Sequence, residues 1–133
     1  MVHDVARLSK NLNSASLARR SVEAVVAASG MGADEIDALL LIASELVTNA
    51  TIHGDEPVML SVSCADSEIT VEVADGNPRV ESVGIRPDDE AATGGRGLRI
   101  VAGLADQWGT RRSHTGKTVW ATKAVTTDPT RAR

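Results

Sequence analysis

The stretch Ser44-Glu45-Leu46-Val47-Thr48-Asn49-Ala50-Thr51-Ile52-His53-Gly54 carries the most informative pattern in this chain of 133 residues. Its polar residues Glu45, Asn49 and His53 recur at four-residue steps, so they stack along one side of a helix. At about 100° per residue, apolar residues fall in the same arc as Glu45 and Asn49, namely Ala38, Leu41, Ile42 and Ile52. An unpaired polar group buried among them costs roughly 1–3 kcal/mol. The pattern therefore predicts a ligand or metal ion as a partner, while local backbone contacts or a wet groove are the simpler alternative for a short motif taken alone.

The same helix carries a second and wider apolar arc on its opposite side. Its members are Ile36, Leu39, Leu40, Ala43, Leu46, Val47 and Ala50. A helix that is apolar on two sides is usually enclosed by protein on both. We therefore expect the wider arc to meet the core, and the side with Glu45 and Asn49 to line a second packed layer or a pocket.

Length and composition limit the classes of protein that fit. A chain of 133 residues suits one domain with a real core, and we place this domain at residues 1–125 and a disordered tail at 126–133. The net charge of −4 and the absence of Phe and Tyr argue against direct nucleic-acid binding. The lone Cys64, together with the lack of a signal peptide or a membrane-spanning apolar run, predicts a cytoplasmic protein without a membrane segment.

The pattern along the chain predicts two helices, two strands, a third helix and two final strands. Asn13 or Ser14 caps a first helix that runs to about Ser29, and Asp34 caps the second helix, which ends at Gly54. The strands are expected at residues 58–64, 69–74, 108–112 and 118–125, with a further candidate at 2–8. This order is typical of an α+β fold in which helices cover one face of a largely antiparallel sheet.

Two glycine-containing stretches follow the second predicted strand. Asp75-Gly76-Asn77-Pro78 opens a long polar excursion, and loops of this length are often functional lids. Gly94-Gly95-Arg96-Gly97 closes the excursion and runs directly into the helical pattern that begins at Leu98. Free N–H groups at a helix start are suited to binding phosphate, although simple loop flexibility also explains such a cluster.

In this order, the stretches give the chain a specific resemblance. It resembles the GHKL (Bergerat-fold) ATPase/kinase superfamily, and within it the anti-sigma-factor serine/threonine kinases and their small actinobacterial-type ATP-binding relatives. The matching stretches are Glu45 to Ala50 with His53, Asp75 to Pro78, Gly94 to Leu98, and Gly116-Lys117-Thr118-Val119-Trp120. The resemblance covers about residues 14–125. It implies a two-layer α/β sandwich of the Bergerat type that binds ATP and Mg²⁺.

Three of the matched residues suit nucleotide binding by their own chemistry. Asn49 offers a neutral carbonyl oxygen to Mg²⁺, an ion that also binds phosphate oxygens. Asp75 can accept a hydrogen from the exocyclic amine of adenine, whereas guanine presents an oxygen there and would be repelled. Gly76 permits close backbone approach to the base. We therefore expect ATP to be preferred over GTP.

The remaining matched residues are expected around the phosphates and the base. Gly94, Gly95 and Gly97, followed by Leu98, would form a mobile lid whose N–H groups meet the phosphates, and Arg96 would add positive charge. His53 is a candidate contact on the phosphate side, and its alternative is an interaction with the helix dipole. Thr118 matches a family position that supports the adenine site, and its alternative is an ordinary strand threonine.

Glu45 is the expected catalytic residue. In the kinases that the chain resembles, the matching Glu is the general base on a serine or threonine hydroxyl, and apolar neighbours would make it a stronger base. The resemblance thus implies a kinase that phosphorylates an anti-sigma antagonist. Whether a sigma factor is also bound and whether the chain forms a homodimer stay open. The alternative is a non-catalytic, nucleotide-dependent module that sequesters a sigma factor or an antagonist.

Overall fold

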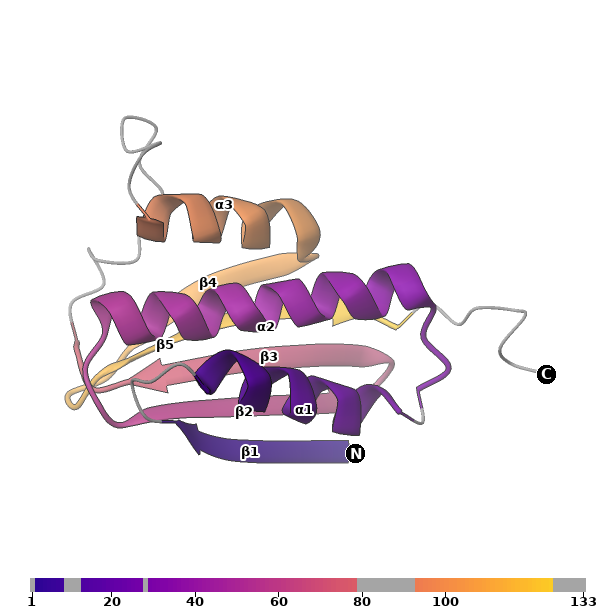
Figure 1. The fold of residues 1–133 in the computed structure, drawn as a ribbon, viewed down its shortest axis with the longest axis horizontal. Coiled ribbons are helices and arrows are strands. Elements are labelled where there is room, and N and C mark those ends of the chain that lie inside the picture. Colours follow the sequence, from indigo (N-terminus) through magenta and orange to yellow (C-terminus); the bar gives the residue numbers. More distant parts are fainter. Residues whose placement is uncertain (1, 9–12, 28, 79–92, 126–133) are drawn as a thin grey trace.

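The fold is a five-stranded antiparallel sheet with helices on one face (Figure 1). The computed structural model describes residues 2–8, 13–27, 29–78 and 93–125. Its strands are β1 (Val2–Leu8), β2 (Val58–Ala65), β3 (Glu68–Asp75), β4 (Gln107–Arg112) and β5 (Lys117–Ala124), in the spatial order β1-β2-β3-β5-β4. The predicted α+β class is confirmed, and the candidate strand at the amino terminus is present as an edge strand.

Three helices lie side by side across the sheet. They are α1 (Ser14–Val26), α2 (Ala33–His53) and α3 (Thr93–Leu104). Helix α1 packs over β1 and β2, α2 contacts the central strands β3 and β5, and α3 packs against α2 and β4. Helix α2 lies between the other two helices, and its wider apolar arc meets the core as predicted, whereas Leu41 and Ile52 of the narrower arc are exposed.

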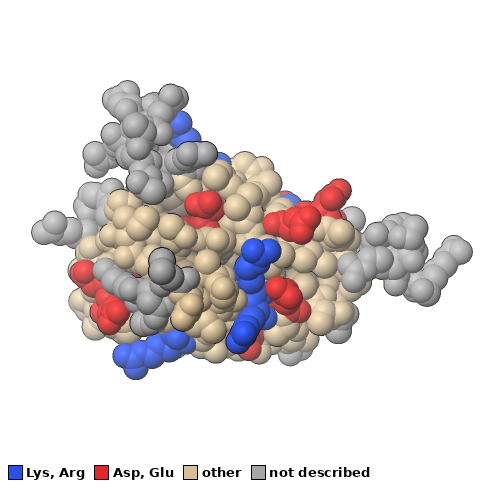
Figure 2. Space-filling view, in the orientation of Figure 1, with Lys and Arg blue, Asp and Glu red and all other residues tan. Residues whose placement is uncertain are grey.

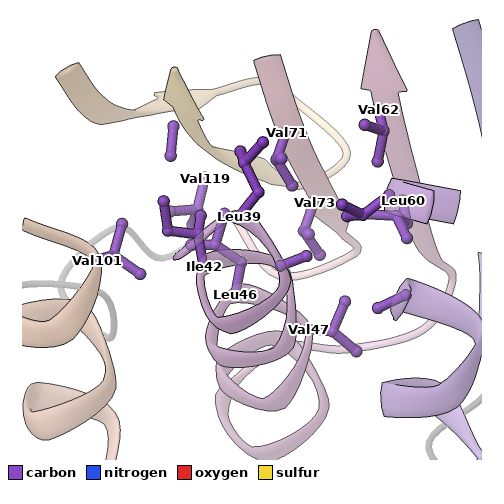
Figure 3. Packing of buried hydrophobic residues seen from close by; sticks show 14 of the residues in the cluster. Leu39, Ile42, Leu46, Val47, Leu60, Val62, Val71, Val73, Val101 and Val119 are labelled. Atoms are coloured by element: carbon purple, nitrogen blue, oxygen red, sulfur yellow. The ribbon is translucent and has the colours of Figure 1, made fainter. Parts of the chain in front are cut away.

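The core lies between α2 and the sheet. In β3, residues alternate between buried and half-buried from Ile69 to Asp75, because successive side chains of a strand point to opposite faces. Val71 and Val73 from this strand meet Leu39, Ile42 and Leu46 of α2, with Val119 of β5 beside them (Figure 3). Burial of these side chains fixes the helix on the sheet, since each contributes roughly 1.5–3 kcal/mol of transfer free energy.

Helix α2 is long and apolar enough to satisfy a simple length and hydropathy criterion for a membrane span. Four of its large apolar residues, Leu39, Ile42, Leu46 and Val47, are at most 1% exposed, however, and belong to the core. Packing against the sheet therefore accounts for these apolar residues of the helix.

Three helix boundaries differ from the sequence predictions. The N-cap of α2 is Gly32, so Asp34 lies in the first turn, where its charge still favours the positive end of the helix. Helix α1 ends at Val26 instead of near Ser29. Helix α3 begins at Thr93, so the glycine cluster lies within the helix instead of preceding it. Tertiary packing explains this last difference, because contact with α2 outweighs the low helix propensity of glycine.

The predicted lid at residues 79–92 and the tail at 126–133 lie outside the described residues.

Candidate functional site

The second half of α2 carries a line of polar side chains with unmet hydrogen-bonding capacity. Asn49 is 4% exposed, and its Oδ1 atom makes no hydrogen bond with any described residue. One turn later, Nε2 of His53 is also buried and makes no hydrogen bond within the described part of the chain. Buried polar atoms are nearly always paired in folded proteins. Two such atoms one turn apart therefore indicate a binding site on this side of the helix.

Glu45 is less enclosed than its sequence neighbours predict. Leu41 is 42% exposed and Ile52 is 51% exposed, and only Ile42 of the expected large apolar neighbours is fully buried. Glu45 itself is half-buried. The expectation that Leu41 and Ile52 enclose this carboxylate is thus wrong, because both side chains are exposed, whereas Ile42 is buried as expected.

Glu45 instead lies directly against α3. A Cβ atom added at Gly97 would lie 2.7 Å from Oε2 of Glu45, so only glycine leaves room for the carboxylate in its present position. The first four N–H groups of any helix lack partners within the helix. Gly97 is the fifth residue of α3, so Glu45 lies against the turn that follows the one with these N–H groups.

The other residues of the predicted phosphate segment have different surroundings. Gly94, Gly95 and Arg96 belong to the first turn of α3. Leu98 is 1% exposed and its side chain packs in the hydrophobic core. Any contact of Leu98 with a ligand would thus involve its backbone, while its side chain anchors the helix.

Asp75 ends β3 and is buried beneath the last residues of α2. Its side chain is 0% exposed, and both carboxylate oxygens lie 3.1 Å from Nζ of Lys117, whose side chain is 1% exposed. The backbone N–H of Asn77 donates to Oδ1 at 2.8 Å. A Cβ atom at Gly54 would lie 2.6 Å from Oδ2, so the end of α2 closes directly over the carboxylate.

Gly76 allows a close approach of the loop after α2, and its predicted approach to the adenine base stays a prediction. Its N–H donates to the carbonyl oxygen of Asp55 at 2.6 Å, and a Cβ atom here would lie 2.5 Å from the carbonyl oxygen of Glu56. Gly116 at the start of β5 is pressed against the carbonyl oxygen of Asp75 in the same way. Gly76 therefore joins the loop after α2 to the end of β3, and Gly116 joins the end of β3 to the start of β5.

The sequence patterns did not single out Lys117, although it pairs with Asp75. They indicated the next residue, Thr118. Asp75 and Lys117 are register partners of β3 and β5, as are Ala74 and Thr118. Because neighbouring strand residues face opposite sides, Thr118 points away from the Asp75 side chain. It lines a hollow of about 220 Å³, and Asp75, Gly76 and Lys117 line the same hollow. The alternation Lys117, Val119, Ala121 in the sequence could have placed Lys117 on the core face.

The described residues contain no group of three or more His, Cys, Asp or Glu side chains that could hold a metal ion. A site built around one amide oxygen still suits Mg²⁺, because this ion keeps several waters and takes further oxygens from phosphates. The Oδ1 atom of Asn49, which has no partner among the described residues, fits that role.

In the view of Figure 2, acidic and basic side chains occur in small separate groups among mostly uncharged described residues.

Comparison with known families identifies the class of this protein. The family model described as a histidine kinase-like ATPase domain matches residues 8–123, so the chain belongs to this family. The matched region includes every residue of the site described above. Membership in an ATPase family implies ATP binding, and it agrees with the resemblance drawn from the sequence.

Individual relatives place the chain near anti-sigma factors. Two proteins named anti-sigma F factor, from two strains of Clostridium botulinum, are each 35% identical over 81 residues. The matched part covers 57% of this chain and 56% of each relative, so just over half of each curated relative is matched.

Two solved structures share the fold. The RsbU and RsbW domains of Rv1364c from Mycobacterium tuberculosis match with a TM-score of 0.70 at 18% identity, covering 94% of this chain and 33% of that one. The histidine kinase domain of a blue-light-activated histidine kinase from Erythrobacter litoralis matches with a TM-score of 0.52 at 23% identity, covering 84% and 61%. The two-layer arrangement of helices on an antiparallel sheet is therefore that of histidine kinase-like ATPases.

Proposed function

We propose that this protein binds Mg-ATP and transfers the γ-phosphate to a serine or threonine hydroxyl of an anti-sigma antagonist. The contact between Glu45 and Gly97 is the observation that carries this proposal. The carboxylate of Glu45 lies next to α3. It is on the same side of α2 as Oδ1 of Asn49, which is buried and makes no hydrogen bond with the described residues. A base, a metal-binding oxygen and backbone donors for phosphate then share one side of α2.

Each residue of the site has a proposed part in holding the substrate. Asn49 would bind Mg²⁺, which supplies charge neutralisation for the phosphate oxygens. The first turn of α3, with Gly94, Gly95 and Arg96, would offer N–H groups and one positive charge to the phosphates. Nε2 of His53, which is buried and makes no hydrogen bond with the described residues, would be a further polar contact for the same end of the nucleotide.

Asp75 would select the base. An ionised carboxylate only accepts hydrogen bonds, so Oδ2 would take a hydrogen from the exocyclic amine of adenine. Gly54 and Gly76 let the backbone close around this end of β3. The carboxylate is fully buried, so the chain around it would have to open for the base to enter.

Glu45 would act as the general base. Its carboxylate takes the proton of the attacking hydroxyl while the hydroxyl oxygen bonds to the γ-phosphorus, and the bond from that phosphorus to the bridging oxygen breaks to release ADP. General base catalysis of this kind typically contributes about 10²–10⁴-fold in rate. The half-buried position of Glu45 leaves one side of it accessible to an incoming protein side chain.

The test is transfer of labelled phosphate from ATP to candidate antagonist domains, with the wild type compared with Glu45→Gln. Glutamine keeps the shape of the side chain but cannot accept the proton. We expect transfer to fall by about 10²-fold or more, with ATP affinity nearly unchanged. Equal transfer by both proteins would rule out Glu45 as the base. A wild type that binds ATP and labels none of the candidates would favour the alternative of a nucleotide-dependent binding module for a sigma factor or antagonist.

A further inference from the structure

The buried ion pair between Asp75 and Lys117 has an uneven arrangement of hydrogen bonds. Nζ of Lys117 donates to Oδ1 of Asp75 at 3.1 Å and to the carbonyl oxygen of Asn77 at 3.3 Å. Oδ1 also accepts the backbone N–H of Asn77. Oδ1 is therefore held by two donors, the ammonium of Lys117 in β5 and the backbone N–H of Asn77 in the turn after β3.

The second oxygen of the same carboxylate is left with free capacity. Oδ2 lies 3.1 Å from Nζ of Lys117, but it makes no hydrogen bond with any described residue. It lies close to Gly54, where a Cβ atom would be 2.6 Å away. The ammonium of Lys117 balances the charge on this oxygen, and a carboxylate oxygen beside an ammonium can still accept a further hydrogen. Oδ2 is therefore the oxygen of this carboxylate that can take a donor from a ligand.

We infer that Lys117 is a positioning residue that sets the selectivity of the site for the exocyclic amine of adenine. This inference rests on the proposed ATP binding. Nζ of Lys117 lies 3.1 Å from both oxygens and balances the charge of the carboxylate, while Oδ1 also accepts the N–H of Asn77, so Oδ2 is the oxygen with more capacity left for the base. An ionised carboxylate with one oxygen fixed accepts a hydrogen in a defined direction. Without Lys117, the carboxylate of Asp75 can rotate, so that either of its oxygens accepts the N–H of Asn77.

The experiment compares two triphosphates that differ only in the amine. ATP carries the amine, and purine riboside triphosphate has a hydrogen in its place. In the wild type we expect ATP to bind about tenfold or more tightly, the range for a hydrogen bond to a charged group. In Lys117→Met, which keeps the length of the side chain without its charge or its donors, we expect this ratio to fall below about threefold. Calorimetry on the full chain measures both affinities.

Lys123→Met is the matched control. Lys123 lies on the same strand and its Nζ donates to the carbonyl oxygen of Leu104 at 3.0 Å, away from the Asp75 carboxylate. We expect this variant to keep the wild-type ratio. Lys117→Gln, which restores an N–H donor without the charge, serves as the second variant should the methionine variant not fold, and an intermediate ratio is expected for it.

The outcomes separate this inference from the proposed function. If Lys117→Met weakens both nucleotides equally, so that the ratio is unchanged, Lys117 is structural only and the inference is overturned. Tighter ATP binding by Lys117→Met would also overturn it, because the ammonium would then compete with the base. A wild type that binds ATP without preference for the amine overturns the inference while ATP binding stands. A wild type that binds no ATP removes the proposed function itself.

Discussion

Replacing Gly97 with alanine tests the contact that places Glu45. A new Cβ atom would lie 2.7 Å from Oε2 of Glu45, whereas atoms of this size are comfortable at about 3.5 Å. The difference of roughly 0.8 Å is the distance by which the carboxylate must retreat. It can retreat at little cost, because the oxygen is the far end of a flexible side chain.

The expected result is loss of phosphate transfer without loss of folding. A misplacement of about 1 Å in a catalytic group can reduce the rate by about 10²-fold. Alanine also favours the helix over glycine by roughly 0.5–1 kcal/mol, which offsets the cost of moving Glu45. Transfer from labelled ATP and thermal unfolding, measured on the same preparation, give the two quantities.

Gly103 provides the matched control on the same helix. A Cβ atom there meets nothing within 4 Å, and no positive φ is recorded for this glycine. Gly103→Ala should therefore raise the unfolding temperature by roughly 2–8 °C for each kcal/mol gained and leave transfer unchanged. Wild-type transfer by Gly97→Ala would refute the placement of Glu45. Equal losses in both variants would show that the mobility of α3, instead of the contact with Glu45, controls the rate.

Three further predictions concern stability and can be checked by urea unfolding. Lys117→Met should destabilise the fold by about 3–5 kcal/mol, because it leaves the buried carboxylate of Asp75 without its counterion, and adding Asp75→Asn to it should recover much of that loss; two single losses that simply add would contradict the pairing. Gly116→Ala should cost about 1–3 kcal/mol or more, since the new methyl group collides with the carbonyl oxygen of Asp75, and wild-type stability would mean that the strand end is not so closely packed. Breaking the surface pair of Arg111 and Glu72, whose side chains are 57% and 36% exposed, should change stability by only about 0–1 kcal/mol, and a loss above 2 kcal/mol would show that the pair is more than a surface contact.

Local patterns predicted the elements of this fold because they depend on neighbours in sequence. The helical period of α2 placed Glu45 and Asn49 on one side, and the alternation of β3 placed Asp75 at a strand end. The same patterns could not tell which elements pack on each arc, so Leu41 and Ile52 were expected to enclose Glu45, although both are exposed. Helix periodicity fixes a direction around the axis, and only the tertiary arrangement decides what lies in that direction.

Contacts between distant strands were the part of the site that the sequence did not reveal. Lys117 follows Asp75 by 42 positions, and the two meet only because β5 pairs with β3 instead of lying beside β2. The sequence resemblance pointed to the next residue, Thr118, which lines the same hollow as Asp75 and stays a prediction for the adenine site. A shift of one position moves a strand residue to the other face of the sheet, so a motif match alone could not decide between the two.

Strand β5 lies between β3 and β4, and this position makes the proposed nucleotide a link between two parts of the chain. Strand β4 joins the sheet only through β5, and β5 joins it only through β3. A base held by Asp75, which Lys117 positions, with phosphates at the start of α3, would therefore tie the segment from α3 to β5 to the segment before it. Saturating nucleotide at about 100 times its dissociation constant would add about 2.7 kcal/mol to folding. Two fragments divided within residues 79–92 should then reassemble more tightly when ATP is present.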